Sequence, residues 1–258
     1  MHSPEEKEKE LKHLLTAQPF DTPQGQDEVL KKRLRQAEAY VELENGIAVL
    51  SDFLHGKGHI LSGSFGRLVG IAQSPVTIDS AFEDEIFGCI PPDDLLERHV
   101  MELHYYRFTQ TLAPDRRKDY HGVCQVRFRL TDGSLVPVLH RTCYLECLPN
   151  GSVWLGLCLY TPCGNAEGQH PMPPQIIDYA TGRTIPTDDY GRLGRQLLSP
   201  RETEVLALLA QGYSSKQIAD RLCIATNTVH RHRQNILTAL QVSNTAMAVQ
   251  IAIRLNLI

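Results

Sequence analysis

The chain has 258 residues, of which 42% are hydrophobic and 22% are charged. That composition excludes a collagen-like or wholly disordered chain, and the length predicts two globular domains. Residues 199–258 carry six cations against three anions, whereas residues 1–198 carry 20 against 27, so a basic module ends a chain whose net charge is −4. We therefore expect an anionic partner for the C-terminal end.

Membrane, secretion and disulfide signals are missing from the sequence. No apolar run approaches the roughly 20 residues of a membrane span. Met1–Glu10 is too charged for a secretory signal. Seven cysteines without a C-x-x-C pair are typical of reduced thiols. We therefore expect a cytoplasmic protein without membrane contact.

Residues 1–44 predict two helices. Pro19, Pro23 and Gly25 separate a short first helix from a second at about 26–44, and Asn45-Gly46 offers a left-handed stop to the second. Leucine, alanine and valine at 30, 34, 37 and 41 form a helical stripe. The stripe fits equally a helix packed on its own domain and a helix that pairs two copies of the chain.

The segment from 45 to 162 predicts an α+β domain. Pro91-Pro92-Asp93-Asp94 opens a long helix to about Leu112, and short helices or loops are expected at 65–71 and 78–89. The expected strands are Ile47–Phe53, His59–Ser64, Tyr120–Leu130, Leu135–Leu148 and Ser152–Tyr160. Asp132-Gly133 and Asn150-Gly151 are hairpin turns between the last three strands. The result is a five-stranded antiparallel sheet with helices on one side.

The order of these elements, together with Phe82–Phe87, Tyr120–Leu130, Asp132-Gly133-Ser134 and Pro149–Tyr160, resembles a PAS domain. The resemblance implies a sensor at 45–162 whose pocket holds haem, flavin, a metabolite or nothing. No cofactor-specific signature is recognisable, so cofactor-binding residues stay unknown and no cofactor is assigned. A small-molecule ligand in the pocket remains open. Residues 163–196, rich in Pro and Gly, form a linker with a small hairpin at about 175–187.

Candidate catalytic and metal-binding groups are not predicted. Cys143 and Cys147 lie on one strand face but about 13 Å apart at ~3.3 Å per residue, too far for pairing or shared ligation. His99 and His104 point about 140° apart on a helix of 3.6 residues per turn. No Ser-His-Asp set, phosphate loop or carboxylate pair can be assembled. We therefore predict a protein that is not an enzyme.

Four helices are expected in the last 60 residues. Ser199, Pro200 and Glu202 open the first with a capping box, and Ser214 or Ser215 caps the second. Thr226 caps a third at Asn227–Leu240, and Ser243 caps a fourth. About three residues join the second and third, the spacing of a helix-turn-helix. No carboxylate occurs from Ala225 to the end, which favours docking of the third helix in a DNA major groove.

Residues 197–258 resemble the LuxR-type helix-turn-helix domain. The matching residues are Leu198-Ser199-Pro200-Arg201-Glu202, Glu204-Val205-Leu206, Gln211-Gly212, Ser215-Lys216-Gln217-Ile218-Ala219, Leu222, Thr228-Val229, His232, Ile236, Leu240, Val242 and Leu257-Ile258. Combined with the PAS-like part, the chain resembles Bacteroides-type PAS–LuxR transcription regulators. His230 and Ala239 stand where the family often has lysine.

The LuxR resemblance implies roles for seven side chains on double-stranded DNA. It implies base contacts by His230, Arg231 and Gln234. It implies phosphate contacts by Lys216, Arg221, Thr228 and Arg233. His232 matches a position that is usually structural in the family, so we expect it to be packed.

We therefore predict a sequence-specific DNA-binding transcription regulator that acts as a homodimer. Its PAS-like domain senses an unknown signal or mediates dimerisation; the alternative is a ligandless interaction module carrying a DNA-binding tail. A phosphorylated response regulator is disfavoured because the first domain lacks a βα repeat. An acyl-homoserine-lactone receptor is disfavoured because the expected aromatic pocket is missing, Trp154 being the single tryptophan.

Overall fold

The computed structural model describes residues 4–21, 25–71, 74–164, 172–185, 198–240, 242, 244–254 and 257–258. Two helices begin the chain, as predicted: α1 (Pro4–Thr16) and α2 (Gln26–Glu44). Asn45 ends α2 in the left-handed conformation at φ 54°, and its N–H donates to the carbonyl of Val41. The turn leads directly into the sheet.

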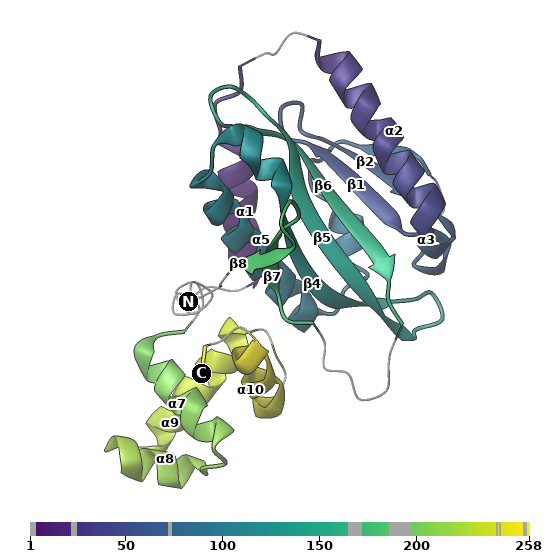
Figure 1. Cartoon of the computed structure of the whole chain (residues 1–258). Helices are drawn as coiled ribbons and strands as arrows, with labels where there is room; N and C mark the ends of the chain where they lie inside the picture. The colour runs from purple at the N-terminus through teal and green to yellow at the C-terminus, as the bar shows by residue number, and fades with distance from the viewer. Residues whose placement is uncertain are drawn as a thin grey trace.

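An antiparallel sheet forms the centre of the N-terminal part (Figure 1). Its strands are β1 (Ile47–Asp52), β2 (Lys57–Ser62), β3 (Val76–Ile78), β4 (Tyr120–Arg129), β5 (Leu135–Cys147), β6 (Val153–Pro162), β7 (Gln175–Asp178) and β8 (Arg183–Ile185). The order across the sheet is β3-β2-β1-β6-β5-β4-β7-β8. Strand β1 therefore lies beside β6, with Ile47 opposite Tyr160, although more than a hundred residues separate them.

The predicted five-stranded sheet is wrong in strand number. All five expected strands form, but β3 adds to one edge and the β7–β8 hairpin adds to the other, which makes eight. Strands β3 and β8 have three residues each, too short to show an alternating pattern in the sequence. The hairpin at 175–185 was expected, but its pairing with β4 is a contact that local signals do not encode. The sheet thus extends into the segment assigned to the linker.

Helices cover both faces of the sheet, not one (Figure 1). On one face, here called the outer face, Ala37 and Val41 of α2 pack on Ala48, Leu61 and Leu159. The opposite, inner face is covered by α1 and by α5 (Pro92–Gln110). Because successive strand residues point to opposite faces, Ile47 and Val49 join the inner core while Ala48 joins the outer one. The stripe on α2 is therefore used within its own domain.

Helix α5 is the long helix predicted from its Pro-Asp opening. It is buried nearly all round, including Arg98, His99 and Glu102, so it places charged groups inside the domain. Shorter helices surround it: α3 (Ser64–Leu68), α4 (Asp84–Phe87) and the 3-10 helix η1 (Pro114–Asp119). All seven cysteines are unpaired thiols. No described helix is long and apolar enough to cross a membrane.

The four predicted C-terminal helices are present as α7 (Pro200–Ala210), α8 (Ser215–Leu222), α9 (Thr226–Ala239) and α10 (Thr245–Arg254). Their core is built from apolar side chains at helical spacing. It includes Val205, Leu206, Ile218, Val229, Ile236, Leu240, Ala248 and Ala252. Ser243, the predicted cap of the fourth helix, lies outside the described residues.

Replacing Gly46 should destabilise the junction between α2 and β1. A Cβ at this position would lie 2.3 Å from the carbonyl oxygen of Tyr160, a backbone atom that cannot move without disturbing β6. We expect Gly46→Ala to lower the free energy of unfolding by roughly 1–3 kcal/mol, the usual cost of overpacking. Urea unfolding followed by the fluorescence of Trp154 in β6 measures this.

Gly164→Ala is the matched control, because its Cβ would meet no atom of the described residues within 4 Å. Equal unfolding midpoints for the Gly46 variant and the native chain would contradict the close approach of the two backbones.

Candidate nucleic-acid interface

Two capping boxes set the start of α7 and α8. The hydroxyl of Ser199 accepts the backbone N–H of Glu202, whose carboxylate accepts the N–H of Ser199 at 2.8 Å. Ser214 and Gln217 form the same reciprocal pair at α8, with Ser214 as the cap. Cys223 ends α8 in the left-handed conformation at φ 52°. Residues 223–225 thus form the expected three-residue turn between α8 and α9.

The predicted start of α9 is wrong by one residue. Ala225, not Thr226, occupies the capping position, and it makes no side-chain cap. Thr226 is the first residue of the helix. A threonine at a helix start is a good cap in general, but here the packing of Val229 and Ile236 fixes the helical register.

One stripe of α9 is exposed and free of acids. Asn227, His230, Arg231, Gln234 and Thr238 are exposed, at spacings of three and four that place them on one side of the helix. We call these five residues the α9 ridge. Val229, Ile236 and Ala239 occupy the opposite side and are buried. The ridge carries amide, imidazole, guanidinium and hydroxyl groups, which are the hydrogen-bonding groups used on base edges.

Helix α8 supplies two further exposed cations, Lys216 and Arg221. Arg221 lies over the ring of Tyr213 at 4.3 Å and donates to its hydroxyl at 2.9 Å. Lys216 follows the α8 cap by two residues, near the positive end of that helix. Both side chains reach solvent on α8, the helix that precedes α9.

Arg233 and Thr228 are only half exposed. The guanidinium of Arg233 donates to the hydroxyl of Ser215 at 2.7 Å and to that of Thr245 at 2.9 Å. It therefore ties α9 to the first turns of α8 and α10. The sequence implies a phosphate contact for Arg233 and carries no signal of this tether.

Asn235 and His232 lie on the side of α9 that faces Glu202. The Asn235 amide donates to the Glu202 carboxylate at 3.1 Å, and the half-buried His232 lies close enough to interact with it electrostatically. Burial acts to raise the pKa of Glu202, but hydrogen bonds from the Ser199 N–H and hydroxyl and from Asn235 outweigh it, so the pKa lies below its ordinary value. Glu202 therefore connects the α7 cap to α9.

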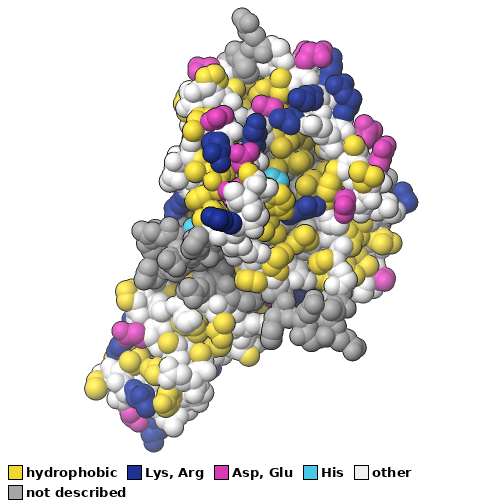
Figure 2. Space-filling model, viewed as in Figure 1, with side chains coloured by type: hydrophobic (Ala, Val, Ile, Leu, Met, Phe, Trp, Pro, Cys, Tyr) yellow, Lys and Arg dark blue, Asp and Glu magenta, His cyan; other side chains and the backbone are white. Residues whose placement is uncertain are grey.

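Charges of both signs are interspersed on the visible face of the N-terminal part (Figure 2). The charges on that face are therefore mixed in sign, whereas residues 225–258 contain no Asp or Glu side chain. Attraction of a polyanion on these surfaces is therefore expected at α9 and α10, since Glu202, Glu204 and Asp220 lie on α7 and α8.

The N-terminal part holds a second group of chemically active side chains, buried between α5 and the sheet. Arg98 is 1% exposed, pairs with Glu102 at 2.9 Å and donates to Glu83. Tyr160 also donates to Glu83, at 2.5 Å. Sequence patterns did not reveal this cluster, because the helix α5, the loop before α4 and the strand β6 are brought together only by the fold.

Glu83, His140 and Cys158 have donor atoms within 4.8 Å of one another, a set compatible with a metal ion. The guanidinium of Arg98 already occupies the neighbourhood, bonded to Glu83 and 3.8 Å from the Cys158 sulfur. A metal ion would meet that positive charge at close range in a buried site, which is costly. Glu83, His140 and Cys158 are therefore better described as residues that surround the Arg98 guanidinium than as a metal site.

Residues 196–252 match the family model described as "Bacterial regulatory proteins, luxR family". The C-terminal module is a luxR-type helix-turn-helix domain. Among curated proteins, the chain is 40% identical over 85 residues to the probable transcriptional regulatory protein SgaR of Hyphomicrobium methylovorum. This match covers 31% of this chain and 40% of SgaR. It is 36% identical over 63 residues to the oxygen regulatory protein NreC of Staphylococcus aureus, and the match covers 24% of this chain and 29% of NreC.

The chain thus spans less than half the length of these curated relatives. Among solved structures, the complex of phage VqmA with DPO is 16% identical with a TM-score of 0.33, covering 89% of this chain and 88% of that one. A likeness at that level assigns neither a ligand nor a fold family to the N-terminal part.

Glu202→Gln should loosen the luxR-type domain. The variant keeps the size of the side chain but weakens the charge-assisted bonds to Ser199 and Asn235. We expect the free energy of local opening over residues 199–240 to fall by about 0.5–2 kcal/mol at neutral pH. Because the pKa of Glu202 is lowered in the folded chain, the difference in stability is fully present above the ordinary carboxyl pKa. It narrows as the pH falls through the lowered pKa and the native carboxylate takes up a proton.

Amide hydrogen exchange of the full chain measures this opening. Glu204→Gln is the control, because Glu204 is an exposed residue that pairs with Arg201 within its own helix. The same exchange rates for both variants would show that Glu202 does not hold α9 in place.

Proposed function

We propose that this chain is a sequence-specific DNA-binding transcription regulator, in which the N-terminal α+β part senses a signal or pairs two copies of the chain. The observation that carries the proposal is the exposed, acid-free α9 ridge on a luxR-type domain. A helix of this kind fits the major groove, about 12 Å wide, with its exposed ridge toward base edges.

The exposed side chains divide naturally into two roles. His230, Arg231 and Gln234 lie on the ridge and are assigned to bases, since imidazole, guanidinium and amide groups pair with purine edges. Lys216 and Arg221 on α8 are assigned to phosphates, together with Thr228 near the start of α9. Arg233 is assigned to a phosphate as well, reached from the position that its bonds to Ser215 and Thr245 define.

The N-terminal part is proposed to be a PAS-like sensor. Its central antiparallel strands, with helices that leave a cavity against the inner face, support that assignment. We propose a homodimer, because two luxR-type domains spaced about one helical turn of DNA, roughly 34 Å, would contact two half-sites together. A signal in the sensor would then act by changing that spacing.

Arg231→Ala and Gln234→Ala should each weaken binding to the preferred duplex by about 1–3 kcal/mol and relax base preference at one position. Lys216→Ala should instead weaken binding to all sequences and reduce the salt slope by about one. A selection from random duplexes followed by fluorescence titration at several salt concentrations measures both effects.

Arg183→Ala is the control for charge alone, because Arg183 is an exposed arginine on β8 of the N-terminal part. Equal losses on preferred and random duplexes for Arg231→Ala and Gln234→Ala would refute base reading by the ridge.

A further inference from the structure

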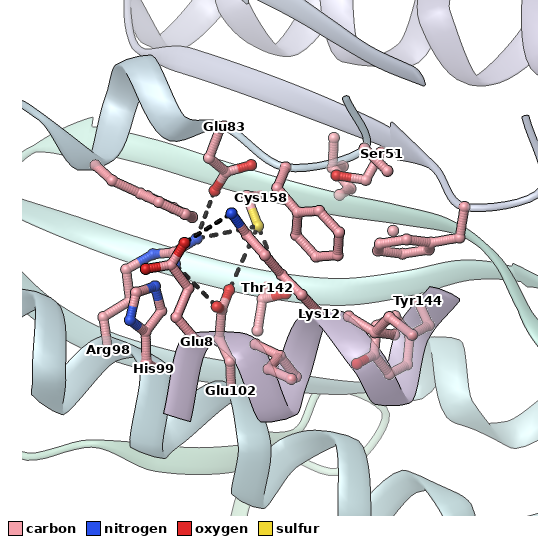
Figure 3. A pocket seen from close by; sticks show the side chains of 18 residues that line it. Glu8, Lys12, Ser51, Glu83, Arg98, His99, Glu102, Thr142, Tyr144 and Cys158 are labelled. Atoms are coloured by element: carbon pink, nitrogen blue, oxygen red, sulfur yellow. Dashed lines mark hydrogen bonds and ion pairs between the residues drawn. The ribbon is translucent and has the colours of Figure 1, made fainter. Parts of the chain in front are cut away.

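A small cavity lies between α1, α5 and the inner face of the sheet (Figure 3). The space open to the centre of a water molecule is about 40 Å³. Since one water needs roughly 10–15 Å³ by this measure, the cavity has room for about three waters, or for a ligand group of similar size. Helix α1 closes one side, and Glu8 and Lys12 project from it toward the charged residues of α5.

The carboxylates around the cavity outnumber the cations. Glu8, Glu83 and Glu102 line it, against Lys12 and Arg98. Lys12 pairs with Glu8 at 2.7 Å and is shared with Asp84 at 2.8 Å. Arg98 pairs with both Glu83 and Glu102. His140 Nε2 lies 3.6 Å from a Glu102 oxygen, but burial lowers the pKa of His140 well below its ordinary value, so His140 adds no positive charge. One negative charge in the cavity wall therefore lacks a counter-ion among the described residues.

The protonation of Glu102 shows the consequence of that imbalance. Burial raises the pKa of Glu102 to about 7, and the nearby carboxylate of Glu83 adds to the rise, although Arg98 opposes it. Other groups around this carboxyl are uncharged or already paired. His140 on β5 has its pKa lowered by burial, and Cys158 and Tyr160 on β6 have theirs raised, so all three are neutral near pH 7. A further cation would stabilise the ionised form of Glu102.

The aromatic walls favour a cation as well. Lys12 Nζ lies 5.2 Å from the ring centre of Phe82, and the Arg98 guanidinium lies 4.5 Å from that of Phe87. Ring faces carry negative partial charge and attract cations, above all in sites shielded from water. Lys12 and Arg98 are thus held by aromatic rings and carboxylates. Groups of the same two kinds line the rest of the cavity.

His99 lines the cavity, and its ring nitrogens are available to hydrogen-bond a ligand. Its side chain is 1% exposed, and neither ring nitrogen has a hydrogen-bond partner among the described residues. Burial and the charge of Arg98 lower its pKa well below the ordinary value, so the ring is neutral. A neutral imidazole has one nitrogen that accepts, which suits an N–H donor on a ligand.

We propose that the cavity binds a small organic cation with N–H donors, of the amidinium or ammonium class, held by the Glu102 carboxylate, the aromatic rings and His99. The proposal names a ligand class for the sensor proposed above. The binding itself does not depend on the sensor role, but its meaning for regulation rests on that role. The excess of carboxylates disfavours anions, and the small volume favours a small bound group.

Three probes of one shape and different charge test the proposal on the full chain. Acetamidinium, acetamide and acetate share four non-hydrogen atoms in a plane and carry one positive, zero and one negative charge. We expect calorimetric titration to show acetamidinium binding at least about tenfold more tightly than acetamide, and acetate not binding. Acetamidinium affinity should fall from about pH 8 to about pH 6, as Glu102 takes up a proton.

Glu102→Gln should bring acetamidinium and acetamide to within about threefold of each other, since the uncompensated charge is removed. Glu146→Gln is the matched control, because Glu146 pairs with Arg33 away from the cavity lining and its variant should keep the preference. Binding of acetamide or acetate as tight as acetamidinium by the native chain overturns the proposal, and so does no saturable binding of any probe. Duplex binding measured without probes is independent of these results, so failure here leaves the regulator assignment separately testable.

Discussion

The burial of Val229, Ile236 and Leu240 determines which side of α9 reaches solvent. Once those three side chains enter the C-terminal core, the 3.6-residue repeat of the helix places Asn227, Arg231 and Gln234 on the far side. Polar ties then hold the helix against its neighbours: Glu202 through Asn235, and Arg233 through hydroxyls at the starts of α8 and α10. A rigidly held helix is what a fixed pattern of base contacts requires.

The two parts of the chain use charge in opposite ways. In the C-terminal domain Arg231 of the ridge is exposed on a helix that has no Asp or Glu, which suits a highly charged partner in water. In the N-terminal part, Arg98, Glu83 and Glu102 are buried, where every unmatched charge is expensive. The shortage of one cation there is the physical reason for assigning the cavity to a small positive ligand. A regulator built this way would combine a buried site for a signal with an exposed site for DNA.

Local sequence signals predicted the helices, the central strands and the luxR-type module. The capping box at Ser199, the Asn45 helix stop and the turns at Asp132-Gly133 and Asn150-Gly151 depend on a few adjacent residues, and all of them form. Long-range contacts were not predictable: the edge pairing of β7, the second face covered by α2, the bonds of Arg233 and the cluster around Arg98. Each depends on residues that the fold brings together from distant parts of the chain.

Introducing a carboxylate into the α9 ridge is the most direct test of whether duplex DNA docks on this helix. Gln234→Glu nearly preserves size and changes only the charge of an exposed side chain, and Gln211→Glu makes the same change at the exposed end of α7. In a fluorescence titration of the full chain with selected duplex, we expect the first variant to lose at least about tenfold in affinity, because a negative group then faces the DNA. We expect the second variant to bind almost normally. Unchanged affinity for Gln234→Glu would contradict the docking of duplex on this ridge.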